Sequence, residues 1–222
     1  MIKTFRNIFL LMLCSSILAN CSRADLMSSS YMTTFDLIYE YFDPGDDLYT
    51  AELVKNIPYA SSLISFNGKN KSLIILEEIR KNEKFWISRD KVRFKENNGR
   101  IVQTIGLPND LYDISRPTVT FKEILNRKKL NYVSYYSFRK PQLNNLKVFI
   151  TSQVTGIEQV DILGVERNLT LIQEQIFAPR INWKEENKYW IDTETDINWK
   201  SLQHISPKLP PIEIELTKKP AN

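Results

Sequence analysis

The stretch KFWISRDKVRFKENNGRIVQTIGL, residues 84–107, indicates most clearly how this chain folds. Apolar and charged side chains alternate over residues 92–95, and Asn97-Asn98-Gly99 is a typical tight turn between two such runs. Alternation with a period of two gives a strand one buried and one solvent-exposed face, which is typical of an antiparallel sheet. We therefore expect strands at 84–88 and 92–95 and a returning strand at 100–107, with Ile101, Ile105 and Leu107 on its buried side.

Similar runs lie on both sides of this stretch. Upstream, Asn67-Gly68 separates two apolar segments, as the turn of a β-hairpin does. Downstream, alternating runs follow one another at short spacing, which is typical of a sandwich or a barrel. We expect strands at 130–138, 148–154, 157–163, 169–177, 188–192, 197–202 and 212–216, with breaks at Gly156, at Gly164 and at Arg167-Asn168. The last of these strands is expected at an edge of the sheet.

Two short helices complete the pattern. Residues 33–42 carry Phe35, Ile38, Tyr39 and Phe42 at helical spacing, and residues 121–125 allow one or two helical turns. The predicted fold class is mainly β: an antiparallel β-sandwich, or an open or half β-barrel, with a few short helices. A length of 222 residues with 42% hydrophobic residues suits one globular domain with a single core.

The N-terminal segment has the layout of a bacterial lipoprotein signal peptide. Residues 1–21, MIKTFRNIFLLMLCSSILANC, contain a basic start, a short apolar run and small residues before Cys21. We predict that residues 1–20 are removed, that Cys21 is acylated, and that residues 21–32 tether a single β-rich domain, residues 33–222. Asn20 departs from the Gly, Ala or Ser usual before the cysteine. An N-terminal anchor helix and an ordinary secretory signal are the alternatives.

The remaining composition limits the function. Cys14 and Cys21 are the only cysteines, so the lipoprotein interpretation leaves the domain without a free thiol and excludes thiol catalysis and thiolate metal sites. After the leader, no apolar run approaches the ~18–20 residues of a membrane-spanning helix. Without Lys3 and Arg6 of the leader, the net charge falls from +4 to +2, so no nucleic-acid partner is expected.

Catalytic and metal-binding patterns are weak. His204 is the only histidine, and no acid stands at a motif spacing from it, so we expect a structural or surface role. Asp192, Glu194 and Asp196 lie in a predicted hairpin turn. The two alternatives there are a weak Ca²⁺ site and turn formation, and turn formation is the commoner role of such acids. We therefore predict no catalytic residue, no metal site, no cofactor and no enzymatic activity.

Tryptophans on predicted strands are the remaining candidates for a binding site. Trp86, Trp190 and Trp199 are candidate glycan-stacking residues, because the C–H faces of sugar rings pack on aromatic rings. The alternative is that these rings pack in the core, as aromatic side chains of β proteins commonly do. Sequence alone leaves both interpretations open.

Several short blocks follow one another in a characteristic order along the chain. They are Leu18–Cys21, Ile57–Ser61, Phe85–Asp90, Asn98–Pro108, Asn182-Trp183, Tyr189–Asp192, Trp199–Gln203 and Ser206-Pro207. Together they resemble the YjbF/GfcB family of lipoproteins, which is associated with capsule and exopolysaccharide production. Asn20 departs from the family pattern, and so does Asp196, which stands where the family tends to have Gly, so Asp196 must tolerate that turn geometry.

The resemblance implies a non-enzymatic lipoprotein that assists capsule or exopolysaccharide secretion or assembly. It implies attachment to the outer membrane through the lipid on Cys21, on the periplasmic face, with polysaccharide export or assembly proteins and the polysaccharide itself as partners. Ser22 after the cysteine also favours the outer membrane. Two alternatives are kept: a half-barrel periplasmic carrier of a lipid or other apolar ligand, and a polysaccharide-processing enzyme with two carboxylates facing each other across a groove.

Overall fold

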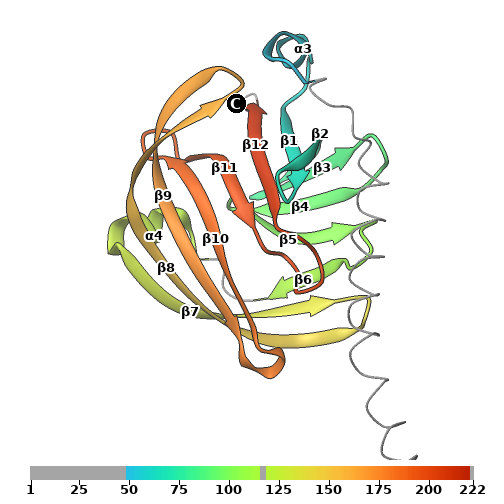
Figure 1. The fold of residues 1–222 in the computed structure, drawn as a ribbon, viewed down its shortest axis with the longest axis vertical. Coiled ribbons are helices and arrows are strands. Elements are labelled where there is room, and N and C mark those ends of the chain that lie inside the picture. Colours follow the sequence, from blue (N-terminus) through green and yellow to red (C-terminus); the bar gives the residue numbers. More distant parts are fainter. Residues whose placement is uncertain (1–48, 116–118, 221–222) are drawn as a thin grey trace, which may run out of the picture.

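A computed structural model describes residues 49–115 and 119–220 of the chain. Two α-helices and twelve strands make up this part (Figure 1). The helices are α3 (Ala51–Lys55) and α4 (Phe121–Arg127), with a short 3-10 turn, η1 (Pro179–Ile181). The strands are β1 (Ser61–Phe66), β2 (Lys69–Arg80), β3 (Glu83–Ser88), β4 (Arg93–Asn97), β5 (Arg100–Ile105), β6 (Leu111–Ser115), β7 (Lys129–Phe138), β8 (Leu143–Ile162), β9 (Val165–Ala178), β10 (Trp183–Asp192), β11 (Ile197–Gln203) and β12 (Ile212–Lys218). No helix among the described residues has the length and apolar character needed to cross a membrane.

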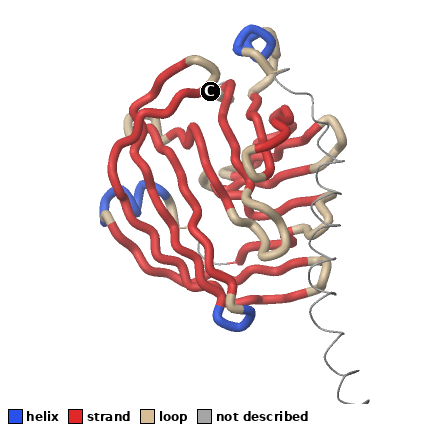
Figure 2. Tube along the Cα trace, viewed as in Figure 1, coloured by secondary structure: helices blue, strands red, loops and turns tan. Residues whose placement is uncertain are grey.

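All twelve strands belong to one antiparallel sheet. Their order is β5-β4-β3-β2-β1-β12-β11-β10-β9-β8-β7-β6. The two end strands, β5 and β6, contact each other without being ladder partners. The sheet therefore curls into a nearly closed barrel, as the tube in Figure 2 shows. Of the two predicted architectures, the open barrel fits the described residues, and the sandwich is not found among them.

The strand at the C-terminus was placed wrongly by its pattern. β12 is not an edge strand: it lies between β1 and β11 and pairs antiparallel with both. Its outward acids are paired with cations, since Glu215 lies 2.8 Å from Lys200 Nζ and 3.0 Å from Lys71 Nζ. Alternation shows only that one face of a strand is buried. It carries no information about how many neighbours the strand has.

Two local predictions were also wrong, in both cases because of a β-bulge. Ile105 is 44% exposed, because a bulge between β4 and β5 shifts the pairing and turns Thr104 inward in its place. Gly156 does not end a strand: β8 is one strand of 20 residues, with a bulge between Val154 and Gly156. The β8–β9 turn is Leu163-Gly164, with φ of 52° and 80°, and Arg167-Asn168 lies inside β9.

Other predictions are confirmed. The Asn67-Gly68 turn joins β1 and β2, the 97–99 turn joins β4 and β5, and residues 121–125 lie in α4. The hairpin formed by β10 and β11 is also where the pattern places it. The predicted helix at 33–42, the leader and Cys21 lie outside the described residues.

The barrel is filled at one end by a hydrophobic core. Apolar side chains from most of the strands meet there, including Phe66, Phe94, Leu111, Val148 and Ile212, each at most 2% exposed. A second cluster lies around α4, where Phe121 and Ile124 pack with Ile172, Tyr189 and Ile191. Phe121 of the second cluster and Trp86 and Ile101 of the first also border the space that the two clusters leave open.

Candidate binding cleft

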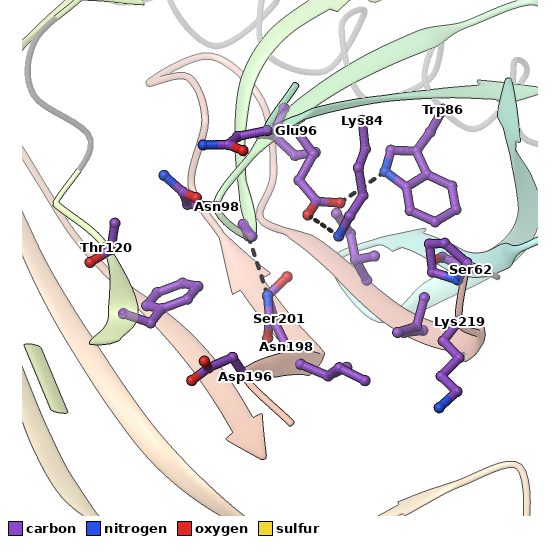
Figure 3. A pocket seen from close by; sticks show the side chains of 18 of the residues that line it. Ser62, Lys84, Trp86, Glu96, Asn98, Thr120, Asp196, Asn198, Ser201 and Lys219 are labelled. Carbon is purple, nitrogen blue, oxygen red and sulfur yellow. Dashed lines mark hydrogen bonds and ion pairs between the residues drawn. The ribbon is translucent and has the colours of Figure 1, made fainter. Parts of the chain in front are cut away.

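A cleft of about 700 Å³ opens at the end of the barrel where the β2–β3, β4–β5 and β10–β11 turns lie, and Figure 3 shows side chains that line it. Its rim is formed by the β2–β3 turn, the β4–β5 turn, the start of α4, the β10–β11 turn and the end of β12. These elements contribute Asn82, Asn98, Thr120, Asp196 and Lys219 respectively. Residues far apart in the sequence therefore surround one cleft, and only the closure of the sheet brings them together.

One wall of the cleft is built by β3 and β4. Lys84 of β3 pairs directly with Glu96 of β4, and its Nζ lies 2.9 Å from Glu96 Oε1. Trp86 donates a hydrogen bond from Nε1 to Glu96 Oε2 at 2.8 Å. Figure 3 shows this carboxylate between the ammonium group and the indole. Trp86 is only 3% exposed, so it frames the cleft and presents almost none of its ring to solvent.

The opposite wall is held together by side chains of β11. Asn198 and Gln203 each donate a hydrogen bond, at 3.2 Å, to the carbonyl oxygen of Gly99. Gln203 also accepts one from the backbone N–H of Ile101 at 2.9 Å. These bonds tie the end strand β5 to β11 across the inside of the barrel. They hold β5 in place at an end of the sheet where no ladder joins it to β6.

Gly99 is required at this wall for two reasons. Its φ of +77° lies in the region that L side chains rarely adopt. A Cβ there would also lie 2.5 Å from a ring carbon of Phe121 and 3.1 Å from Nδ2 of Asn198. The start of α4 can therefore approach the β4–β5 turn closely. Thr120 caps that helix with Glu123 in a reciprocal capping box.

A buried ion pair lies beneath the cleft and crosses the barrel from β5 to β9. Arg100 donates to Glu174 from Nε at 3.2 Å and from Nη2 at 2.6 Å, and its Nη1 donates to the carbonyl of Val119 at 2.8 Å. Tyr132 Oη and Ser152 Oγ donate to the same carboxylate at 2.9 and 2.6 Å. Every strong polar group of the pair thus has a partner, which a charge in the interior requires.

The electrostatics of this pair are set by burial and by the partner charge. Burial raises the pKa of Glu174, but the Arg100 charge and the donated hydrogen bonds outweigh it and leave the pKa below its usual value. Burial lowers the pKa of Arg100, but Glu174 leaves it raised. Burial also raises the pKa of Tyr132 and Tyr189 beside them. All four groups therefore keep one protonation state at neutral pH, as a structural network does.

The chemistry of the cleft is that of a binding site with many weak polar contacts. Amide and hydroxyl side chains line it, among them Asn82, Asn98, Asn198, Thr120 and Ser201. Apolar patches come from Ile79, Ile197 and Ile214. Two lysines at the rim, Lys122 and Lys219, make no ion pair with a described residue. Such a lining offers hydrogen bonds to hydroxyl groups and small apolar surfaces to C–H faces.

The three predicted tryptophans do not form one site. Trp86 is in the cleft wall, whereas Trp190 lies on the other face of β10 from the buried Tyr189. Side chains of the protruding β8–β9 hairpin contact the other two rings. Glu158 of β8 accepts a hydrogen bond from Trp190 Nε1 at 2.7 Å. The guanidinium of Arg167, in β9, lies 3.7 Å from the Trp199 ring centre. Glycan stacking by these rings stays a prediction.

The predicted turn acids have structural contacts. Asp192 accepts from the backbone N–H of Glu194 at 2.9 Å and from Thr195 Oγ1 at 2.7 Å, which confirms the turn-forming role. Asp196 has φ of +57°, so it does tolerate the turn geometry. Within residues 49–115 and 119–220, no three His, Cys, Asp or Glu side chains gather as a metal site would need.

His204 lies outside the cleft. Its Nε2 is 3.4 Å from Glu185 Oε2, and its backbone N–H donates to Asn187 at 2.7 Å. Burial lowers the pKa of His204, and the Glu185 charge opposes this only in part. The predicted structural role therefore fits its contacts.

Sequence reasoning missed the polar residues inside the barrel. Glu174 carried a usable signal, because it stands between Ile172 and Ile176 on what is otherwise the apolar face of a strand. Gln203 lies on the face of β11 that also carries the buried Ser201. Arg100 had no such signal, since an arginine after a turn is normally solvated.

Comparison with known proteins identifies the family. Residues 35–216 match the family model described as group 4 capsule polysaccharide lipoprotein GfcB, YjbF. The uncharacterized lipoprotein GfcB of Escherichia coli (strain K12) is 22% identical over 209 residues, covering 90% of this chain and 93% of that protein. The uncharacterized lipoprotein YjbF of the same strain is 22% identical over 183 residues, covering 79% and 82%.

A solved structure shows the same fold. The crystal structure of the hypothetical lipoprotein YmcC from Escherichia coli (K12) aligns with a TM-score of 0.67 at 19% identity, covering 85% of this chain and 96% of that chain. The match of the family model to most of the chain, together with the two relatives, agrees with the resemblance drawn from the short blocks. The chain therefore belongs to the family of group 4 capsule polysaccharide lipoproteins GfcB and YjbF.

Proposed function

We propose that this protein is a non-enzymatic accessory lipoprotein that assists the secretion or assembly of a capsule polysaccharide, and that its cleft holds a segment of that polysaccharide. Membership of a capsule polysaccharide lipoprotein family supports the pathway. The observation that carries the binding role is the open cleft of about 700 Å³ with its amide and hydroxyl lining. Sugar hydroxyls are matched by side chains of this kind.

The anchor belongs to the same proposal. Acylation of Cys21 attaches the domain to the outer membrane, and the domain works on the periplasmic face. The test is palmitate labelling of the full-length protein and of a Cys21→Ala variant, followed by separation of the two membranes on a density gradient. Labelling that persists in the variant, or protein that sediments with the inner membrane, would contradict the anchor or its location.

The arrangement of the acids in the cleft supports a binding role over catalysis. Glu96 is bonded to both Lys84 and Trp86, so its carboxylate is already committed to two partners. Asp196 is the other carboxylate of the lining, and it belongs to the β10–β11 turn. A glycoside hydrolase needs one carboxylate free to donate a proton and a second one free to act as base or nucleophile.

A second candidate function rests on the apolar part of the cleft. Ile79, Ile197 and Ile214 give it patches that an acyl chain would contact. A half-barrel carrier of a lipid would use these patches, and the polar rim would then contact the headgroup. The polar groups that line the cleft make this the weaker candidate, because an apolar ligand would leave them without partners.

One experiment separates the two candidates. Full-length protein in non-ionic detergent is titrated with polysaccharide extracted from the surface of the producing cells, and separately with a fluorescent fatty acid. We expect polysaccharide binding that weakens about tenfold in an Asn82→Ala/Asn98→Gly variant, since two hydrogen bonds are lost. Asn98 has φ of +48°, which glycine adopts readily, so the variant should keep the fold.

Asn67→Gly is the matched control, because Asn67 has φ of +53° in the β1–β2 turn and does not line the cleft. Its affinity for the polysaccharide should equal that of the unmodified protein. Fatty-acid binding that the cleft variant weakens, without any binding of polysaccharide, would favour the carrier. New reducing ends in the polysaccharide would refute the non-enzymatic role.

A further inference from the structure

A second surface lies outside the barrel, on the outer face of β7, β8, β9 and β10. The ladder registers align Val133, Phe149, Phe177 and Lys184 in one row across the four strands. Val148, Ile150 and Ile176, on either side of this row along their strands, are buried in the core. Strand alternation therefore points the row outward, away from the interior of the barrel.

Polar rows flank this aromatic row on the same face. Tyr135 pairs with Lys147 on one side, and the next row on the other side begins with Asn131, Thr151 and Gln175. A row that crosses all four strands, as the aromatic row does, is about 14 Å long at the usual strand spacing. The face thus presents aromatic rings, amides and a hydroxyl side by side over several sugar lengths.

Positive charge is concentrated on this face. One row further along, Lys129, Gln153, Gln173 and Lys188 lie side by side on the same face. The four rows together contain four lysines, Lys129, Lys147, Lys184 and Lys188, and a single carboxylate, that of Glu186, giving a net charge of +3. The whole chain without its predicted leader carries only +2. Glu186 is itself 3.7 Å from Lys188. Lys147 and Lys184 make no ion pair with a described residue, so their charges are available to a ligand.

The two unpaired lysines are placed beside the aromatic rings. Lys147 Nζ lies 4.9 Å from the ring centre of Phe149, and Lys184 Nζ lies 5.0 Å from that of Phe177. Phe149 is 41% exposed although it is a large apolar side chain. Contacts between a cation and an exposed ring are weak, so a ligand can displace the ammonium groups from the rings at small cost.

We propose that the outer face of β7–β10 binds a carboxylate-bearing polysaccharide, with Phe149 and Phe177 against the sugar rings and Lys147 and Lys184 pairing with the carboxylates. This rests on the proposed function, because it assumes that a polysaccharide is the ligand, and it adds the charge of that ligand. The cleft holds a segment through hydrogen bonds. The outer face holds an anionic part of the same chain through charge and stacking.

The side chains favour a polysaccharide over a membrane surface on this face. Asn131, Thr151 and Gln175 form a polar row next to the aromatic one, and amides of this kind match hydroxyls and resist insertion into lipid. Membrane-binding faces instead combine their cations with deeply inserting apolar side chains.

The test compares native surface polysaccharide with the same material after chemical reduction of its carboxyl groups. Full-length protein in non-ionic detergent should bind the native form more tightly, and 0.5 M NaCl should reduce that preference. A Lys147→Gln/Lys184→Gln variant should lose about five- to tenfold in affinity for the native form only. Phe149→Ala should weaken the binding of both forms of the polysaccharide. The control variant Lys55→Gln/Lys91→Gln removes two exposed lysines elsewhere and should leave the affinity for both forms unchanged.

The other outcomes are distinct. Equal binding of both forms, unaffected by the lysine variant but weakened by the cleft variant, overturns this inference and leaves the proposed function standing. No binding of either form overturns both. Binding to phosphatidylglycerol vesicles that the lysine variant abolishes, with polysaccharide affinity unchanged, would make the face a membrane-docking surface and overturn the inference.

Discussion

Glu174 shows how single residues decide the interior of this barrel. A carboxylate between two buried isoleucines is stable there because Arg100, Tyr132 and Ser152 all donate to it. A buried ion pair gains little over apolar residues of similar size, yet removal of one partner leaves an uncompensated charge. The pair therefore specifies where β5 lies against β9, whatever its net contribution to stability.

Replacing one partner of the Arg100–Glu174 pair should lower the free energy of unfolding far more than replacing both partners. Glu174→Gln leaves the Arg100 charge buried without its counterion, so we expect a loss of about 3–5 kcal/mol in the free energy of unfolding. Arg100→Met/Glu174→Leu removes both charges and should cost clearly less. Urea denaturation of the two variants measures the difference. A single variant as stable as the double one would show that Arg100 does not depend on Glu174 for charge compensation.

Gly99 provides a second test at the same scale. Gly99→Ala should destabilise the protein by about 1–3 kcal/mol for two reasons. The new Cβ would lie 2.5 Å from the Phe121 ring, and the alanine would have to adopt a positive φ. Gly164→Ala is the matched control: its φ is +80°, but nothing lies within 4 Å of the added Cβ. The difference between the two midpoints in urea isolates the packing cost. Equal midpoints would contradict the close approach of α4.

Among the elements, β12 has the largest consequence for the fold. It is the last strand in the chain but joins two parts of the sheet, β1–β5 on one side and β6–β11 on the other. Since Lys200 and Lys71 pair with its Glu215, side chains as well as the ladder hold this junction. An antiparallel strand in this position cannot be lost without exposing two unpaired edges.

Truncation before Ile212 should therefore abolish cooperative unfolding. The product would lack the strand that connects β1 to β11, and we expect weak near-UV circular dichroism and no sharp thermal transition. A protein truncated after Lys219, which keeps β12 intact, should have a melting temperature within a few degrees of that of the full chain. A cooperative transition in the shorter product would mean that the two parts of the sheet fold without this junction.

At the scale of the whole molecule, one curled sheet separates two surfaces with different chemistry. The cleft at the open end is lined by amide, hydroxyl and apolar side chains and is nearly neutral, whereas the outer face of β7–β10 carries the excess positive charge. The β8–β9 hairpin protrudes beyond the last pairing with β7, at Gln153, and its side chains contact Trp190 and Trp199. These surfaces are the ones on which the proposed polysaccharide contacts depend.

The buried pair also predicts how the whole barrel responds to acid. The folded-state pKa of Glu174 lies below its usual value of 4.5, so its contribution to stability is present above that pH and is lost as the pH falls towards the folded-state pKa. We expect the free energy of unfolding to fall more steeply below pH 4.5 in the unmodified protein than in Arg100→Met/Glu174→Leu. Urea denaturation at several pH values measures the slopes. Parallel curves would contradict this assignment.

Much of the local structure follows from sequence patterns, because alternation and turn residues act over a few positions. The 84–107 stretch predicted a meander, and Asn67-Gly68 predicted a hairpin. The bulges in β5 and β8 were not predictable in this way. One inserted residue reverses the inward and outward positions, as it does for Thr104 and Ile105, and leaves no mark in the composition of the strand.

The sequence by itself determined that the chain is mainly β, where most turns lie, and that its family is that of the capsule polysaccharide lipoproteins. These follow from short-range patterns and from the order of motifs. Only the tertiary structure decided that β12 is central, that the sheet curls into a barrel, and that Asn98, Asp196 and Lys219 surround one cleft. The physical reason is that strand pairing joins residues far apart in the chain, and the alternation of a strand shows that it has a buried face without showing which strands lie beside it.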